Sequence, residues 1–308
     1  MPPFDQTVNM TLTASEERRD SGQNSEEGLD STMSMPDVRY ERFGPSPKLA
    51  LYVEQFWMVS APGEQTPRRE ILIPNGRPML LLTFASPSVR IDPLTGNRFP
   101  NSNMLSGIAS QPYVIEQSGE SRYIGVQFRP YGLAAFLQGD KLVDRALSID
   151  EWLGTPGAEA LSSSLLAHDF GQARVEALDT YLCSVAAEVD REDVHLLSST
   201  LERIEQAGGQ VRVEELAQQL HMHYTTFFRM FKNYVGIGPK LYVDIVRYYT
   251  FVGGLLSDRP SGSDTLIAEL EGYYDQAHAS KEFRRFTGVT PHAFRTTLNN
   301  IAKLMHQS

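Results

Sequence analysis

The sequence lacks the features of a secreted, membrane-bound or disulfide-linked protein. Its 308 residues include a single cysteine, Cys183, so no disulfide can form within the chain, as is usual in a reducing compartment. No stretch approaches the roughly 18 to 20 uninterrupted apolar residues of a membrane span. The N-terminus has no basic region followed by an apolar core, so we see no secretory signal. These absences favour a cytoplasmic protein without membrane contact.

Catalytic and metal-binding patterns are also missing. Residues 1–167 contain neither histidine nor cysteine, which excludes the His-x-His strand motif of metal-dependent barrel enzymes. Cys183 falls on the apolar side of an amphipathic segment without a basic neighbour, so a structural role is favoured over a reactive thiol. Glu116 and Glu120 are expected to flank a hairpin turn rather than to form a catalytic pair. We predict no metal, no cofactor, no catalytic residue and no enzymatic activity.

The formal net charge of -10 is unevenly distributed. Residues 1–35 carry 2 basic and 7 acidic side chains, residues 36–190 carry 13 and 18, and residues 191–308 carry 13 of each. A neutral C-terminal third is not a nucleic-acid binder by charge alone. Any such function therefore depends on where its charges lie.

The N-terminal half divides into a polar segment and a β-rich segment. Residues 1–35 have no apolar period and are expected to be disordered; translation starts either at Met1 or near Met35. The following segment, residues 36–190, begins with short apolar runs that read as strands. These runs are Leu49–Ser60, Met79–Ala85 and Tyr123–Pro130, with turns at Pro74–Gly76 and Asp92–Asn97. Short strands at this spacing predict a small barrel or sandwich.

Helical patterns dominate the rest of the chain. Residues Arg174–Val189 place five apolar side chains on one stripe, and the charged run Asp190–Asp193 is the expected domain boundary. From there residues 191–302 read as helices with short turns. The predicted fold class is therefore α+β, a β-rich domain followed by an all-α domain.

One motif occurs twice in the helical domain. The segment Phe227–Pro239 aligns with Ala279–Pro291 at an offset of 52, with aromatic, basic, Gly and Pro positions coinciding. Each copy follows a shorter helix and a tight turn, since Val213, Leu216, Ala217 and Leu220 form one apolar face before the first copy. Two short helices joined by a tight turn, the second with a basic face, are typical of a helix-turn-helix unit.

Helical geometry separates the buried positions from those that could meet DNA. In the first copy Phe227, Phe231 and Tyr234 point inward. In the second copy the inward positions are Ala279, Phe283 and Phe286. The outward residues offer donors for guanine and phosphate, an amide for adenine and small groups for the thymine methyl. The predicted base-reading residues are Thr225, Phe228, Arg229, Gln276, Ala277, His278 and Lys281. The predicted phosphate contacts are Tyr224, Lys232, Ser280, Arg284 and Arg285.

The stretch Lys240–Asp258 between the two copies has the period and length of a rigid helix of about five turns. The C-terminal part of the chain resembles the DNA-binding domain of the AraC/XylS transcription regulators. The resemblance rests on Phe228-Arg-Met-Phe-Lys232, on Arg247 in the linking helix, and above all on Gly272–Pro291. It implies seven helices, two adjacent major grooves as the DNA site, RNA polymerase as a partner, and a bacterial, nucleoid-associated location.

The N-terminal half is similar to the cupin-like sensing domain that many of these regulators carry. The matching features are Trp57, the turn Pro74–Gly76, and Gly125-Val126-Gln127-Phe128-Arg129-Pro130. This resemblance implies a small-molecule effector, with Trp57 and Arg129 as candidate contacts, and a homodimer as a further partner call. Arg129 could capture an acidic effector or pair with a nearby carboxylate.

The sequence thus predicts a sequence-specific, DNA-binding transcription regulator with two helix-turn-helix units. The alternative is a small-molecule-binding protein whose helical domain docks a protein partner rather than DNA. The small Ala279 at an inward position predicts a looser second reading helix, and hence a larger contribution from the motif of Arg229 than from that of Lys281.

Overall fold

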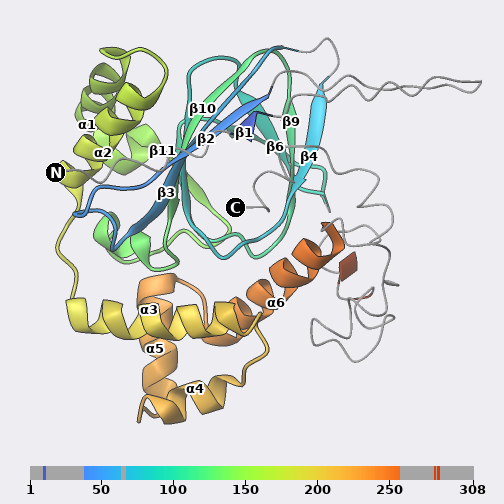
Figure 1. Ribbon diagram of the computed structural model, residues 1–308, viewed down its shortest axis with the longest axis vertical. Coiled ribbons are helices and arrows are strands. Elements are labelled where there is room, and N and C mark those ends of the chain that lie inside the picture. The colour runs from blue at the N-terminus through green and yellow to red at the C-terminus, as the bar shows by residue number, and fades with distance from the viewer. Residues whose placement is uncertain are drawn as a thin grey trace, which may run out of the picture.

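The computed structural model describes residues 10–11, 38–63, 67–93, 95–256, 281 and 283–284. Two β-sheets form the first part of the chain, two helices flank them, and four further helices lie against one end of the sheets (Figure 1). The predicted α+β class, with a β-rich part followed by a helical part, is confirmed.

Antiparallel pairing joins the strands within each of the two sheets. The first sheet holds, in spatial order, β1 (Met10–Thr11), β2 (Arg39–Phe43), β3 (Val53–Ala61), β10 (Ser121–Phe128), β5 (Met79–Thr83), β8 (Met104–Ser106) and β11 (Ala146–Ser148). The second sheet holds β4 (Arg68–Leu72), β9 (Tyr113–Gln117), β6 (Ser88–Ile91) and β7 (Arg98–Asn101). β1 pairs with β2, with Met10 opposite Tyr40 and Thr11 opposite Arg39.

The central strands of the first sheet contribute to a buried cluster on each face, since successive side chains along a strand point to opposite faces. On β3, Phe56 and Met58 join a core with α1 (Ile149–Leu166) and α2 (Gln172–Val185). Trp57 and Val59 belong to a second cluster with Leu81 on the opposite face. The same strand thus serves the helices on one side and the second sheet on the other.

Two details of the sequence interpretation change. The stretch Leu49–Tyr52 is a turn, and β3 begins only at Val53. Leu49 N–H donates to Ser46 O and Tyr52 N–H donates to Leu49 O, and both side chains are buried without a strand. The turn after β9 leads to β10 in the other sheet, so it links the two sheets instead of closing a hairpin within one.

The remaining helices pack below the sheets in Figure 1. They are the short 3-10 helix η1 (Gly132–Ala135) and the helices α3 (Arg191–Gln206), α4 (Val213–Gln219), α5 (Tyr224–Val235) and α6 (Pro239–Leu256). Asp190 caps α3, because its side chain accepts hydrogen bonds from Glu192 N–H and Asp193 N–H. No helix in the described ranges is long and apolar enough to cross a membrane.

The helical core is not made by helices alone. Ile108 and Tyr131, both from the first half of the chain, belong to the same buried cluster as Phe227 and Tyr242. Ile108 is fully buried and Tyr131 is 2% exposed. One buried apolar cluster therefore spans the interface between the two halves.

Candidate nucleic-acid interface

The helices α4 and α5 form the first helix-turn-helix unit. Val213, Leu216 and Ala217 bury one face of α4, as the apolar spacing predicts. The turn is tight because His221 takes a positive φ of 52° and its N–H donates to Gln218 O. His223 is the N-cap of α5, but its side chain makes no capping hydrogen bond.

A buried apolar face anchors α5. Phe227 and Phe231 are fully buried, and their rings meet edge to face with centroids 5.7 Å apart. Tyr234 is half-buried and its hydroxyl donates to Asp193 Oδ2 of α3 at 2.8 Å. Gly236 ends the helix at φ 87°, a left-handed conformation in which glycine has no Cβ clash. The inward positions predicted for this copy are thus the ones that pack.

The opposite face of α5 is exposed. Thr225, Arg229 and Lys232 form a polar row open to solvent. The first turn of α5 has no acidic side chain to repel a phosphate. Tyr224 and Phe228 flank this row and are 43% and 38% exposed, among the few large apolar side chains on the described surface. The five outward residues predicted for this copy therefore lie on one accessible surface.

Only three described residues belong to the second copy, and they fall as the repeat predicts. Lys281 and Arg284 are exposed, whereas Phe283 is fully buried against the rings of Tyr248 and Phe251 in α6. Phe283 is the counterpart of Phe231, and both are buried. The other predicted contacts of this copy, and Ala279 and Phe286, lie outside the described residues; these contacts are Gln276, Ala277, His278, Ser280 and Arg285.

The helix α6 connects the two copies. It begins at Pro239 and runs to Leu256, close to the predicted linking helix Lys240–Asp258. Arg247 ties it to the loop after α3, since its Nη2 donates to Gly209 O at 2.8 Å. Buried side chains on several sides, including Val243, Tyr248 and Val252, hold it within the domain.

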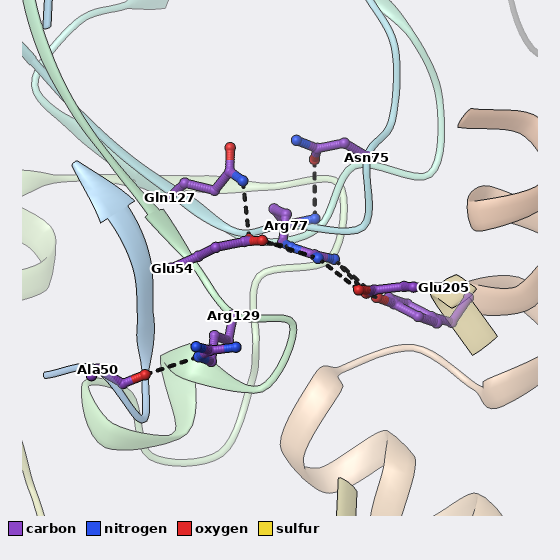
Figure 2. Close-up of polar contacts among 8 residues, drawn as sticks. Ala50, Glu54, Asn75, Arg77, Gln127, Arg129 and Glu205 are labelled. Carbon is purple, nitrogen blue, oxygen red and sulfur yellow. Dashed lines mark hydrogen bonds and ion pairs between the residues drawn. The ribbon is translucent and has the colours of Figure 1, made fainter. Parts of the chain in front are cut away.

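Arg77, whose side chain is 14% exposed, joins the sheets to the helices (Figure 2). The Arg77 guanidinium donates to Glu54 Oε2 at 2.5 Å and, from Nη1 and Nη2, to both carboxylate oxygens of Glu205 at 2.8 and 3.1 Å. Its Nη1 also donates to the Tyr242 hydroxyl at 3.0 Å, and that hydroxyl donates to Glu205. We call Arg77, Glu54, Glu205 and Tyr242 the interdomain cluster.

Charge balance explains the protonation states in the interdomain cluster. Burial alone would raise the pKa of the Glu54 carboxyl, but the Arg77 guanidinium and a hydrogen bond from Gln127 together lower it below its ordinary value. Burial raises the pKa of the Tyr242 phenol far above its usual range, so its hydroxyl keeps its proton and can donate. The Arg77 guanidinium thus lies between two carboxylates. Each carboxylate also accepts a hydrogen bond from a neutral donor, Glu54 from Gln127 and Glu205 from Tyr242.

The two candidate effector residues are not brought together. Arg129 lies beside the interdomain cluster, and its Nε donates to Ala50 O at 2.9 Å (Figure 2). Trp57 instead lines a cavity of about 80 Å³ between the two sheets, whose walls include Leu72, Leu81 and Ile115. The Trp57 ring lies on Gly125, where an added Cβ would come within 2.0 Å of it.

Two residues that line this cavity carry a buried polar atom without a hydrogen-bond partner. Trp57 is 6% and Asn101 is 5% exposed, yet Trp57 Nε1 and Asn101 Oδ1 have no partner. An unsatisfied buried donor or acceptor is costly, so both atoms suit a bound molecule. Elsewhere in the described ranges no group of three His, Cys, Asp or Glu side chains could hold a metal ion.

The remaining sequence candidates have ordinary roles. The Cys183 thiol meets the Ser46 hydroxyl at 3.4 Å and Asp179 Oδ1 at 3.7 Å. Glu116 pairs with Arg69 and Arg98, and Glu120 pairs with Arg122. Each of these carboxylates is therefore engaged by an arginine.

Two family models match the sequence. One, described as a helix-turn-helix domain, matches residues 216–297, which span the turn and α5 and extend through the second copy. The C-terminal domain is an AraC-type helix-turn-helix domain. The chain is therefore a DNA-binding transcription regulator. A second model, a domain of unknown function (DUF6597), matches residues 41–145 and so covers most of both sheets.

Several solved structures are similar to this chain. ToxT from Vibrio cholerae O395 is 12% identical, with a TM-score of 0.44 over 80% of this chain and 98% of that one. ToxT from Vibrio cholerae strain SCE256 with a bound unsaturated fatty acid is 10% identical, with a TM-score of 0.42 over 77% and 97%. The C-terminal domain of AraT, a response regulator from Geobacillus stearothermophilus, is 24% identical, with a TM-score of 0.30 over 34% and 88%. No curated protein matches the sequence.

The sequence interpretation missed the interdomain cluster. Arg77 directly follows the predicted Pro74–Gly76 turn, whose Asn75 Oδ1 accepts from Arg77 N–H at 3.0 Å. Its partner Glu205 lies 128 residues further along the chain. The sequence therefore predicts the turn, but no local pattern indicates which carboxylate Arg77 would contact.

Proposed function

We propose that the protein regulates transcription by reading two adjacent major grooves of promoter DNA with its two helix-turn-helix units. One observation carries this proposal. The outward residues of α5 are exposed over a fully buried aromatic face, and Lys281, Phe283 and Arg284 repeat that arrangement at an offset of 52. A rigid α6 between them would hold both reading helices on one side of a duplex, about 34 Å apart.

The chemistry of the side chains assigns their roles. Thr225, Phe228 and Arg229 would read bases from α5, while Lys281, with Gln276, Ala277 and His278, would do so from the second unit. Tyr224, Lys232, Ser280, Arg284 and Arg285 would contact phosphates and set the register. Affinity should then fall steeply with salt, because each neutralised phosphate releases counterions.

Substitution in the full-length protein tests this assignment. Arg229→Ala and Lys281→Ala should each weaken binding to a selected DNA site by about 1–3 kcal/mol and relax the preference at one base pair. Arg122→Ala, an exposed arginine on the β-rich domain, is the matched control and should leave binding unchanged. Unchanged DNA affinity and unchanged base preference in both test variants would contradict the assignment of Arg229 and Lys281 as base-reading residues. Absence of any salt-sensitive mobility shift would favour the alternative, a helical domain that docks a protein partner.

A small-molecule effector in the β-rich domain is the second part of the proposal. Trp57 is the better candidate contact for the effector because it lines a cavity. Arg129 already donates from Nε to the Ala50 carbonyl. The ligand should be compact, largely apolar and uncharged, with an acceptor for Trp57 Nε1 and a donor for Asn101 Oδ1. A thermal-shift screen of such compounds should give stabilisation that Trp57→Phe reduces. RNA polymerase and a second copy of the chain are further proposed partners of the DNA-bound form.

A further inference from the structure

The reading face of α5 carries two aromatic rings that the neighbouring hydrogen-bond donors do not explain. Tyr224 and Phe228 are 43% and 38% exposed, and their ring centroids lie 6.3 Å apart at an interplanar angle of 35°. Apolar surface left in water forgoes the free energy that burial would give. A pair of exposed rings beside a polar row therefore suits a surface that becomes covered in a complex.

The Phe228 ring is held in position. It lies against Gly238 in the turn before α6, where an added Cβ would come within 2.7 Å of Phe228 Cε2. Tyr224, one turn earlier on the same side of α5, contacts it from the other direction. The ring is thus supported from both sides while more than a third of its surface stays open.

The ring also has a defined place relative to the donors. At about 100° per residue, Phe228 lies next to the row of Thr225, Arg229 and Lys232, on the side that faces Gly238. The other side of the row is polar and carries Thr226 and Asn233, both exposed. One α-helix therefore presents an apolar edge, a row of donors and a polar edge in turn.

We propose that Phe228 recognises the C5-methyl group of a thymine in the major groove, with Tyr224 as the residue that positions its ring. This inference rests on the proposed function and names the base class that the first unit reads. Thymine is the base that offers a methyl group in the major groove, and apolar side chains contact it there. The half-site of the first unit should then contain a thymine beside the base that Arg229 contacts.

Deoxyuridine provides a test that changes the methyl group alone. Sites are first selected from random duplexes with the full-length protein, and Arg229→Ala identifies the half-site of the first unit. Each thymine there is then replaced by deoxyuridine. One replacement should weaken binding by about fourfold, the factor that corresponds to burial of a single methyl-sized group.

Variants locate the methyl contact. With Phe228→Ala, thymine and deoxyuridine at that position should bind equally, whereas Thr226→Ala, on the polar edge, should keep the fourfold difference. Phe228→Leu keeps an apolar side chain and should retain part of the difference, which covers the case in which Phe228→Ala does not fold.

The outcomes separate this inference from the function on which it depends. Selection of no DNA site would remove the proposed function itself. A selected site at which no deoxyuridine replacement weakens wild-type binding would overturn the thymine contact alone. So would a Phe228→Ala protein with unchanged DNA affinity and impaired transcription, because that result would assign the rings to a protein partner.

Discussion

At the scale of single residues, Tyr234 shows how the reading helix is tied to its own domain. Its position within the repeat predicts an inward aromatic, and it is half-buried rather than fully buried because its hydroxyl reaches Asp193 Oδ2 at 2.8 Å. Phe286 takes the equivalent place in the second copy and has no hydroxyl. The link between the reading helix and α3 is therefore a property of the first copy.

Tyr234→Phe should lower the free energy of unfolding by about 1 kcal/mol at neutral pH, since it removes one hydrogen bond. Burial and the hydrogen bond to Asp193 raise the pKa of Tyr234 from 10.0 to about 12. A raised pKa gives stability that is present below the ordinary value and lost as pH rises towards the folded value. The difference between wild type and variant, measured by urea unfolding, should thus shrink between pH 10 and 12. A constant difference across that range would contradict this account.

At the scale of secondary-structure elements, what the sequence reveals depends on whether the signal is local. The period of α5 and its match to the second copy correctly predict which side chains are buried, because each helix carries its own pattern. The start of β3 is misplaced, because Leu49 and Tyr52 are buried from a turn and look like strand residues. No local sequence pattern predicts the contact between β3 and α3 through Arg77, because it depends on how distant elements dock.

Arg77→Met should destabilise the protein by about 2 kcal/mol. Removing one partner of a buried ion pair is costly, but water reaches Glu54 and Glu205, which are 33% and 32% exposed, and reduces the effect. Thermal unfolding of the full chain measures it. Arg122→Met is the control, because its pair with Glu120 is about half exposed and should be worth little.

The pH dependence of this difference identifies its source. Arg77 lowers the pKa of Glu54 below the ordinary 4.5. A lowered carboxyl pKa gives stability that is present above the ordinary value and lost as pH falls through the folded value. The gap between wild type and Arg77→Met should therefore close as pH falls below about 4.5. A gap that persists there would mean that packing, not charge, is responsible.

At the scale of the whole molecule, the two halves share a core and should unfold together. Ile108 precedes β9 in the β-rich part, yet it is fully buried among helical side chains. Tyr131, the N-cap residue of η1, is buried in the same cluster of helical side chains. The charged run Asp190–Asp193 lies at the start of α3, and buried side chains from both sides of it share one cluster.

Ile108→Ala should cost about 2–5 kcal/mol, as buried large-to-small substitutions do. Both tryptophans, Trp57 and Trp152, lie in the first half of the chain, so their fluorescence follows that half while far-UV circular dichroism follows the helices. Both signals should shift together in urea. Leu166→Ala, at a position 67% exposed, is the control and should shift neither. A helical transition that stays in place while the fluorescence transition moves would show that the halves are independent.

The shared core also limits how such a regulator can be recombined. Joining the β-rich part to the reading domain of another protein at residue 190 would leave Ile108 and Tyr131 facing a surface that was not shaped for them. The same cut would leave Arg77 without Glu205, its bidentate partner on α3. A working chimera would have to exchange Ile108, Tyr131 and Arg77 together with the helices. Leu51 and Val143 pack against the same cluster from the first half, so the unit that can be swapped is larger than the helical domain.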